Sequence, residues 1–109
     1  WVLPLAVVVI VAGARLGTHN LADTPLVHLH RAEGYLEQGD YNGALGEIRL
    51  ALDVDPAIGQ AYYLRARALA ELGDIRQARA DLSRALQLGL DAETAREALS
   101  LLITLNLRR

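Results

Sequence analysis

The sequence lacks cysteine and lysine, and both absences limit what the protein can do. Without cysteine, the chain has no disulfide, no thiolate metal ligand and no cysteine nucleophile. All eleven basic residues are arginines, and thirteen acidic residues bring the net charge to -2. A chain so close to neutrality offers no electrostatic reason to bind nucleic acid. We therefore expect no nucleic-acid partner.

Charge is also absent from the opening segment WVLPLAVVVIVAGA, which runs from Trp1 to Ala14. The segment is apolar on all sides rather than amphipathic, as is typical of a helix in lipid. Fourteen helical residues reach about 21 Å, short of the roughly 30 Å hydrocarbon core. Arg15 can extend the span by snorkelling to the interface, and residues before Trp1 would lengthen it further.

We therefore expect a single transmembrane anchor helix at residues 1–17 and a linker at residues 18–24, with the lipid bilayer as a partner of the first segment. Arg15 alone does not indicate on which side of the membrane the rest of the chain lies. The residues expected to contact lipid are Trp1, Val2, Leu3, Leu5, Val7, Val8, Val9, Ile10 and Val11.

Two other interpretations of the opening segment stay open. Ala12-Gly13-Ala14 is an A-x-A pattern at the end of an apolar stretch, as in a cleaved signal peptide, although no basic region precedes it. The segment also fits a helix packed against the domain or a partner. We favour the anchor because the rest of the chain accounts for its own core.

The rest of the chain contains an internal repeat with an offset of 34 residues. The stretch HLHRAEGYLEQGDYNGALGEIRLALDVDP (28–56) aligns without a gap to YYLRARALAELGDIRQARADLSRALQLGL (62–90). The matched pairs include Arg31 with Arg65, Ala32 with Ala66, Gly39 with Gly73, Asp40 with Asp74, Ala44 with Ala78, Ile48 with Leu82 and Ala51 with Ala85.

Each repeat is predicted to be a pair of helices joined by a tight turn. Apolar residues recur at spacings of three and four on both sides of QGDY and LGDI, which is the helical pattern. Gly39 and Gly73 can adopt the left-handed conformation that ends a helix, and Asp40 and Asp74 can cap the next one. Alanines let neighbouring helices approach closely, and larger side chains fill the gaps.

These positions resemble the tetratricopeptide (TPR) repeat. That pattern has small residues at repeat positions 8, 20 and 27, bulky ones at 11, 17 and 24, Gly at 15 and Pro at 32. The first repeat matches with Ala32, Tyr35, Gly39, Tyr41, Ala44, Ile48, Ala51 and Pro56, and the second with Ala66, Leu69, Gly73, Ile75, Ala78, Leu82 and Ala85. In the second repeat Leu90 stands in place of the proline.

The resemblance implies an all-α fold in which antiparallel helical hairpins stack into a solenoid, with repeats at 25–58 and 59–92. A capping helix is expected at 93–109, with Asp91 as N-cap. We expect an apolar stripe of Ala95, Leu99, Leu102 and Ile103 to cover the second repeat. Leucines lie on more than one side of this helix, so it is either buried on two sides or meets a partner.

In TPR arrays the first helix of each repeat lines a concave face. The resemblance therefore implies a partner-binding surface made of Leu29, Glu33, Leu36, Tyr63, Arg67, Ala70, Glu97 and Leu101. An open alternative is that Glu33, Arg67 and Glu97 pair with one another across the helices. Chaperone-binding members use Lys and Asn where this chain has Leu29 and Glu33, so the resemblance does not extend to that activity.

No residue pattern indicates a catalytic, metal or cofactor site. His28 and His30 are two residues apart and point in directions about 200° apart on a helix, so they cannot share an ion. Ser83 and Ser100 lack the context of a nucleophile, and no phosphate-binding glycine loop is present. We expect a membrane-anchored protein-interaction module rather than an enzyme, serving as scaffold, assembly factor or accessory subunit of a membrane complex. The alternative is a soluble or secreted TPR adaptor whose first segment is a signal peptide.

Overall fold

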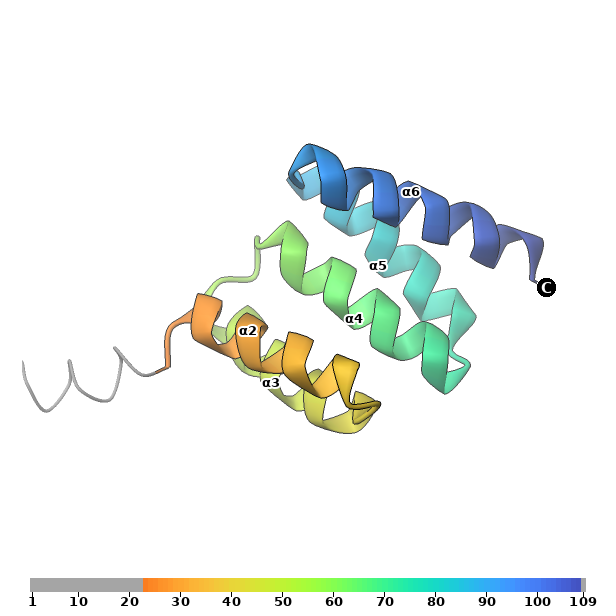
Figure 1. The fold of residues 1–109 in the computed structure, drawn as a ribbon. Coiled ribbons are helices and arrows are strands. Elements are labelled where there is room, and N and C mark those ends of the chain that lie inside the picture. The colour runs from red at the N-terminus through yellow and green to blue at the C-terminus, as the bar shows by residue number, and fades with distance from the viewer. Residues whose placement is uncertain (1–22, 109) are drawn as a thin grey trace, which may run out of the picture.

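The computed structural model describes residues 23–108, and this part of the chain forms five helices (Figure 1). They are α2 (Pro25–Glu37), α3 (Tyr41–Val54), α4 (Gly59–Leu72), α5 (Ile75–Leu88) and α6 (Ala92–Leu107). The predicted transmembrane helix at residues 1–17 lies outside the described residues. Among the helices that are described, none is long and apolar enough to span a bilayer.

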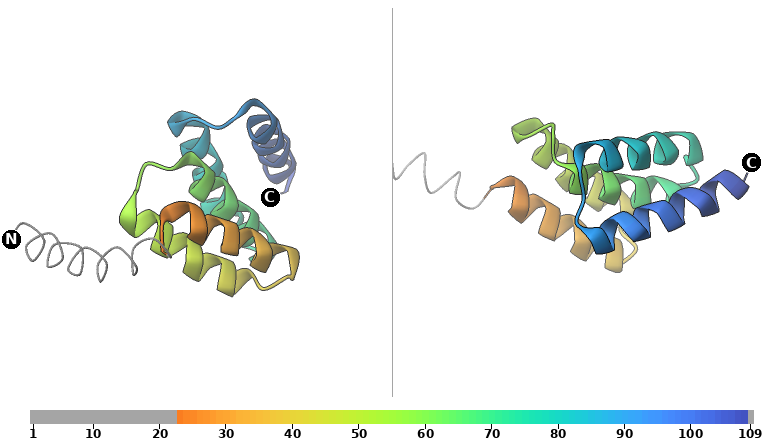
Figure 2. Two further views of the ribbon diagram at one scale, coloured as in Figure 1. Left: turned by 60° about the vertical axis from the view of Figure 1, so that its left-hand side comes forward. Right: turned by 90° about the horizontal axis from the view of Figure 1, so that it is seen from above.

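The helices form two antiparallel hairpins and a final single helix, and the all-α solenoid architecture is confirmed. Helix α2 packs on α3 and α4 packs on α5, while contacts between α3 and α4 join the two hairpins. Helix α6 follows the second hairpin and packs on α5, as Figure 2 shows from two further sides. Helices α2 and α4 begin at Pro25 and Gly59, the first residues of the two proposed repeats.

The turns within the two hairpins have the predicted chemistry. Gly39 and Gly73 have φ values of 78° and 93°, in the left-handed region that favours glycine. The carboxylates of Asp40 and Asp74 accept hydrogen bonds from backbone N–H groups in the first turn of α3 and α5, at 2.9 and 3.2 Å. These local signals therefore fix where each helix ends and the next begins.

Small side chains hold the helices close together. The six alanines that the two repeats share are completely buried: Ala32, Ala44, Ala51, Ala66, Ala78 and Ala85. Ile48, Leu64 and Leu82 fill the space between them and are also fully buried. Because dispersion contacts are gained over short distances, this alternation of small and large residues gives a dense core in a thin stack.

The prediction for the face of α6 that packs on the repeats was wrong in part. Ala98 and Leu105 are the buried residues of this helix, and Leu102 packs against the core as predicted. Leu99 and Ile103 instead remain 48% and 61% exposed. The helix is rotated about its axis so that the small Ala98 side chain sits against the repeats, which permits a close approach.

Candidate partner-binding groove

A groove of about 600 Å³ lies between the first helices of the hairpins and α6. Leu36 of α2, Tyr41 of α3 and residues of α4 and α6 line it. The full set is Leu36, Tyr41, Tyr63, Arg67, Ala70, Glu71, Arg96, Glu97, Ser100, Leu101 and Thr104. Most of these residues come from α4 and α6, so these two helices form the main walls.

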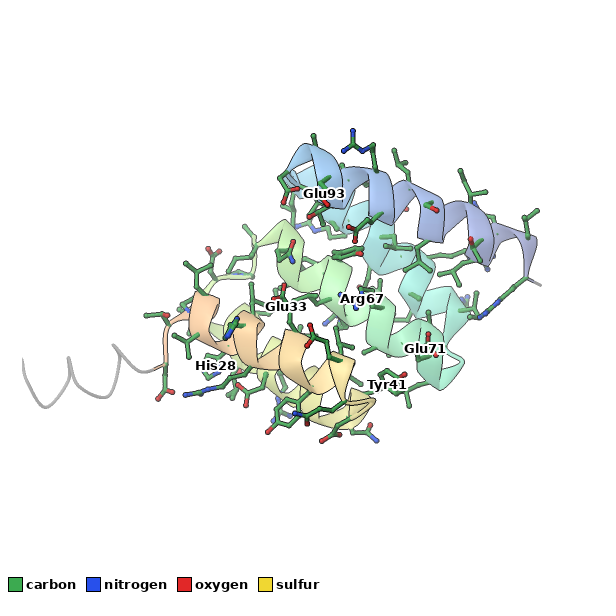
Figure 3. The ribbon with its side chains drawn as sticks, viewed as in Figure 1. His28, Glu33, Tyr41, Arg67, Glu71 and Glu93 are labelled. Atoms are coloured by element: carbon green, nitrogen blue, oxygen red, sulfur yellow. The ribbon has the colours of Figure 1, made fainter. Side chains whose placement is uncertain are left out.

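Helical spacing explains how α4 reaches the groove. Tyr63, Arg67 and Glu71 are four residues apart and therefore lie along one side of the helix, with Ala70 beside them. Glu97, Leu101 and Thr104 of α6 are spaced by four and three residues and therefore also share one side of their helix. Figure 3 shows Tyr41 and Glu71 toward one end of the helices and His28 toward the other.

Six of the eight residues proposed for the concave face line this groove: Leu36, Tyr63, Arg67, Ala70, Glu97 and Leu101. The other two do not. Leu29 is 4% exposed and belongs to the core, so no partner can reach it. Glu33 does not line the groove but accepts a 3.3 Å hydrogen bond from Gln60 Nε2, which bridges α2 and α4. The groove therefore lies beyond this bond, toward the C-terminal ends of these two helices.

Tyr63 connects the two walls of the groove. Its hydroxyl donates a 2.7 Å hydrogen bond to Glu97 Oε2 on α6, and the Arg67 guanidinium lies 5.8 Å from the centre of its ring. Burial, followed by the hydrogen bond to Glu97, raises the pKa of the Tyr63 hydroxyl from 10.0 to about 12. The group therefore remains a neutral donor at physiological pH, and the bond to the Glu97 carboxylate persists.

Comparisons with known proteins agree with this architecture. A tetratricopeptide-repeat family model matches residues 59–88. The tetratricopeptide repeat and J domain-containing co-chaperone DNJ1 of Cryptococcus neoformans is 38% identical over 74 residues, which are 68% of this chain and 14% of the co-chaperone. The chain carries a tetratricopeptide-repeat domain.

A solved structure shares the fold of this TPR domain. The first TPR of Spaghetti (RPAP3), bound to the HSP90 peptide SRMEEVD, aligns with a TM-score of 0.68 and 23% sequence identity. The alignment covers 77% of this chain and 64% of that one. The chain therefore corresponds to a small part of the co-chaperone and to about two thirds of the solved domain.

Sequence reasoning missed five residues of the groove: Tyr41, Glu71, Arg96, Ser100 and Thr104. Glu71 comes one turn after Arg67, and extending the concave-face pattern by four residues finds it. Steps of three residues from the predicted Glu97 and Leu101 likewise find Ser100 and Thr104. Tyr41 was assigned to packing, and it does contact the core while its other side reaches the groove.

The three proposed charges of the concave face do not pair with one another. Within residues 23–108 no ion pair joins Glu33, Arg67 and Glu97. Glu33 and Glu97 are bonded to neutral groups instead.

The structure also places the histidines. Nδ1 of His28 lies 2.7 Å from Glu47 Oε1 in a buried position, while His30 is exposed. In the part of the chain that the structure describes, no three His, Cys, Asp or Glu side chains are arranged to hold a metal ion.

Proposed function

We propose that the TPR domain binds an extended segment of a protein partner in the groove between α2, α4 and α6. One observation carries this proposal. The groove has apolar walls, and four charged side chains stand around them: Arg67, Glu71, Arg96 and Glu97. Within residues 23–108 no ion pair involves any of these four, and Glu97 is hydrogen-bonded to Tyr63, so the charges of Arg67, Glu71 and Arg96 can pair with a ligand.

The residues of the groove indicate the chemistry of the ligand. Leu36, Ala70 and Leu101 offer a surface for an apolar side chain, Arg67 and Arg96 for a carboxylate, and Glu71 for a cation. We infer a segment that carries an apolar residue with charges of both signs nearby. Such a ligand uses each wall of the groove.

This ligand differs from the peptide seen with the structural neighbour. That peptide, SRMEEVD, is predominantly acidic. Chaperone-binding members of the family hold a C-terminal carboxylate with Lys and Asn at the places of Leu29 and Glu33. In this chain Leu29 is buried and Glu33 is itself acidic. We therefore propose an internal segment of the partner rather than a free carboxyl terminus.

Site-specific photo-crosslinking tests the location of binding. A photo-reactive benzoylphenylalanine replaces Ser100, which is exposed and lines the groove, or Ser83, which is exposed on α5 outside it. Both full-length variants are irradiated in the cells that make the protein. We expect a discrete adduct from position 100 that is missing from position 83. Identical adducts from both positions would contradict binding in the groove.

We further propose that residues 1–17 tether this domain to a membrane as a single-pass anchor, and that the protein is a scaffold, assembly factor or accessory subunit of a membrane complex. The absence of charge from Trp1 to Ala14 supports the tether. Resistance of the protein to alkaline carbonate extraction is the expected result. A mature protein that begins at Arg15 would contradict the anchor and favour the secreted adaptor.

We also propose that the chain binds its partner without catalysing a reaction. The sequence has no cysteine, and the two serines lie on separate helices, α5 and α6. Among the described residues, the hydrogen bond that involves a histidine side chain joins it to Glu47 rather than to a serine. A hydrolase screen with the purified protein is expected to give the buffer rate.

A further inference from the structure

The side chains that line the groove are arranged in three layers along its length. Helices α2, α4 and α6 begin at the same end of the molecule and run in the same direction (Figure 1). The hydrogen bond between Tyr63 and Glu97, which are 34 residues apart, sets equivalent positions of α4 and α6 side by side. The first layer holds Tyr63, Arg96 and Glu97, the second Arg67, Ser100 and Leu101, and the third Leu36, Ala70, Glu71 and Thr104.

The two charges of α4 in the groove are held apart. Arg67 and Glu71 are four residues apart on one side of the helix, a spacing at which opposite charges can pair. Within residues 23–108, however, they form no ion pair. The Arg67 guanidinium instead lies 5.8 Å from the centre of the Tyr63 ring, which is one turn closer to the start of the helix. This contact draws the positive charge toward the first layer and away from Glu71.

The two ends of the groove consequently differ in charge. Arg67, Arg96 and Glu97 give a net charge of +1 at the end where the helices begin, whereas Glu71 gives −1 in the third layer. Tyr41 also lines the groove and lies toward the same end as Glu71 (Figure 3). Because the face of an aromatic ring attracts cations, Tyr41 reinforces the preference of this end for a positive charge.

We propose that the groove selects its ligand by the order of the charges in it. An acidic side chain of the bound segment pairs with Arg67 and Arg96, and a basic side chain pairs with Glu71 beside the Tyr41 ring. An apolar side chain packs between the two on Leu101, in the second layer. This inference rests on the binding of a peptide segment in the groove, and it adds which end of the groove takes which charge.

The positions of the charged residues also set the spacing of the charges in the ligand. Glu71 lies about 6 Å beyond Arg67 along the helix axis, at about 1.5 Å per residue. Arg96 is equivalent to position 62 of α4, so Glu71 lies about 13 Å beyond it. An extended chain advances about 3.3 Å per residue. We therefore expect an acidic and a basic residue about two to four positions apart in the ligand, with an apolar residue between them.

Selection of peptides from a random library by the full-length protein tests this order. The wild type is compared with Glu71→Arg and with the control Glu37→Arg. Glu37 is the equivalent residue of the first repeat and is also exposed, but it does not line the groove. We expect the wild type and Glu37→Arg to select peptides with the acidic, apolar and basic residues at the stated spacing. Glu71→Arg should select peptides with an acidic residue in place of the basic one.

Exchange of charge between protein and ligand then shows which end binds which side chain. In one derivative of a selected peptide Glu replaces the basic residue, and in another Lys replaces the acidic residue. Fluorescence polarisation measures the dissociation constants of both. Glu71→Arg should bind the first derivative at least about tenfold more tightly than the wild type does, and Arg96→Glu should do the same for the second. Neither variant should improve the binding of the other derivative.

The outcomes separate this proposal from the proposed function on which it rests. The charge order is overturned if Glu71→Arg selects the same peptides as the wild type, or if the two variants fail to rescue their own derivatives. Peptides that bind in the groove without a shared pair of charges would also overturn it, while peptide binding itself would stand. A wild-type protein that selects no peptide would refute binding in the groove and the charge order with it.

Discussion

Arg65 on α4 and Asp81 on α5 are joined by two hydrogen bonds, of 2.7 Å from Nε to Oδ2 and 2.8 Å from Nη2 to Oδ1. Asp81 is 2% exposed and accepts a third hydrogen bond from Gln77. The hydrogen bonds to the Asp81 carboxylate hold the pKa of the Arg65 guanidinium above its ordinary value. The corresponding pair of the first repeat, Arg31 and Glu47, is separated by 3.9 Å. The same link therefore joins the two helices of each hairpin, but it is much tighter in the second.

Replacement of the Asp81 carboxylate by an amide should destabilise the domain. In Asp81→Asn the new NH2 group faces the donors of Arg65 and Gln77, so at least one buried hydrogen bond to a charged group is lost. We expect the free energy of unfolding to fall by about 1.5–3 kcal/mol. Glu47→Gln is the matched variant of the first repeat and should cost less. Urea unfolding followed by circular dichroism measures both, and equal losses would contradict the different roles of the two links.

Gly59 should not tolerate a side chain. A Cβ atom there would overlap the carbonyl oxygen of Gly89 and lie 3.0 Å from that of Ala85. Both are backbone atoms that cannot move without shifting the end of α5, so Gly59→Ala should lower the melting temperature.

Gly46→Ala is the control for this substitution. Gly46 lies inside α3 with no atom within 4 Å of the added Cβ, so alanine should stabilise the domain by about 0.4–1 kcal/mol. Thermal unfolding distinguishes the two variants. A stabilised Gly59→Ala variant would show that the start of α4 and the end of α5 are further apart than the structure places them.

Tyr63 should make the domain sensitive to alkaline pH. Its pKa is about 12 in the folded state and 10.0 without the fold, so between pH 10 and 12 only the unfolded chain releases this proton. The contribution of Tyr63 to stability is therefore complete below pH 10 and is lost as the pH rises toward 12.

Tyr63→Phe removes this contribution. The free energy of unfolding of the variant should fall less steeply from pH 10 to 12 than that of the wild type. Ultraviolet absorbance of tyrosinate should also show one late-titrating group in the wild type that disappears in Tyr63→Phe. Titration of all four tyrosines near pH 10 would refute the buried bond between Tyr63 and Glu97.

The hairpins could be predicted from the sequence because their signals are local. A glycine that accepts positive φ and an aspartate that caps the next helix act within a few residues, and Gly39-Asp40 and Gly73-Asp74 show both. The shared alanines also marked the buried faces correctly.

The face of α6 could not be predicted in the same way. Leucines surround this helix, so hydrophobic spacing alone does not define one buried side, and contact with α5 decides its rotation. The limits of the groove depend on similar contacts between helices. The bond between Glu33 and Gln60 forms across two helices, and no local pattern indicates it. The link between Arg65 and Asp81 was missed although both repeats carry an acid at that position.

The central claim is that the groove binds a peptide segment, and peptide affinity tests it most directly. Peptides are selected from a random library on the full-length protein, and their dissociation constants are measured by fluorescence polarisation. Ser100→Trp places an indole in the groove, whereas Ser83→Trp makes the same change on α5. The account predicts that Ser100→Trp weakens binding at least about tenfold, a cost of about 1.4 kcal/mol, while Ser83→Trp leaves affinity unchanged. Equal affinity of the two variants would contradict it.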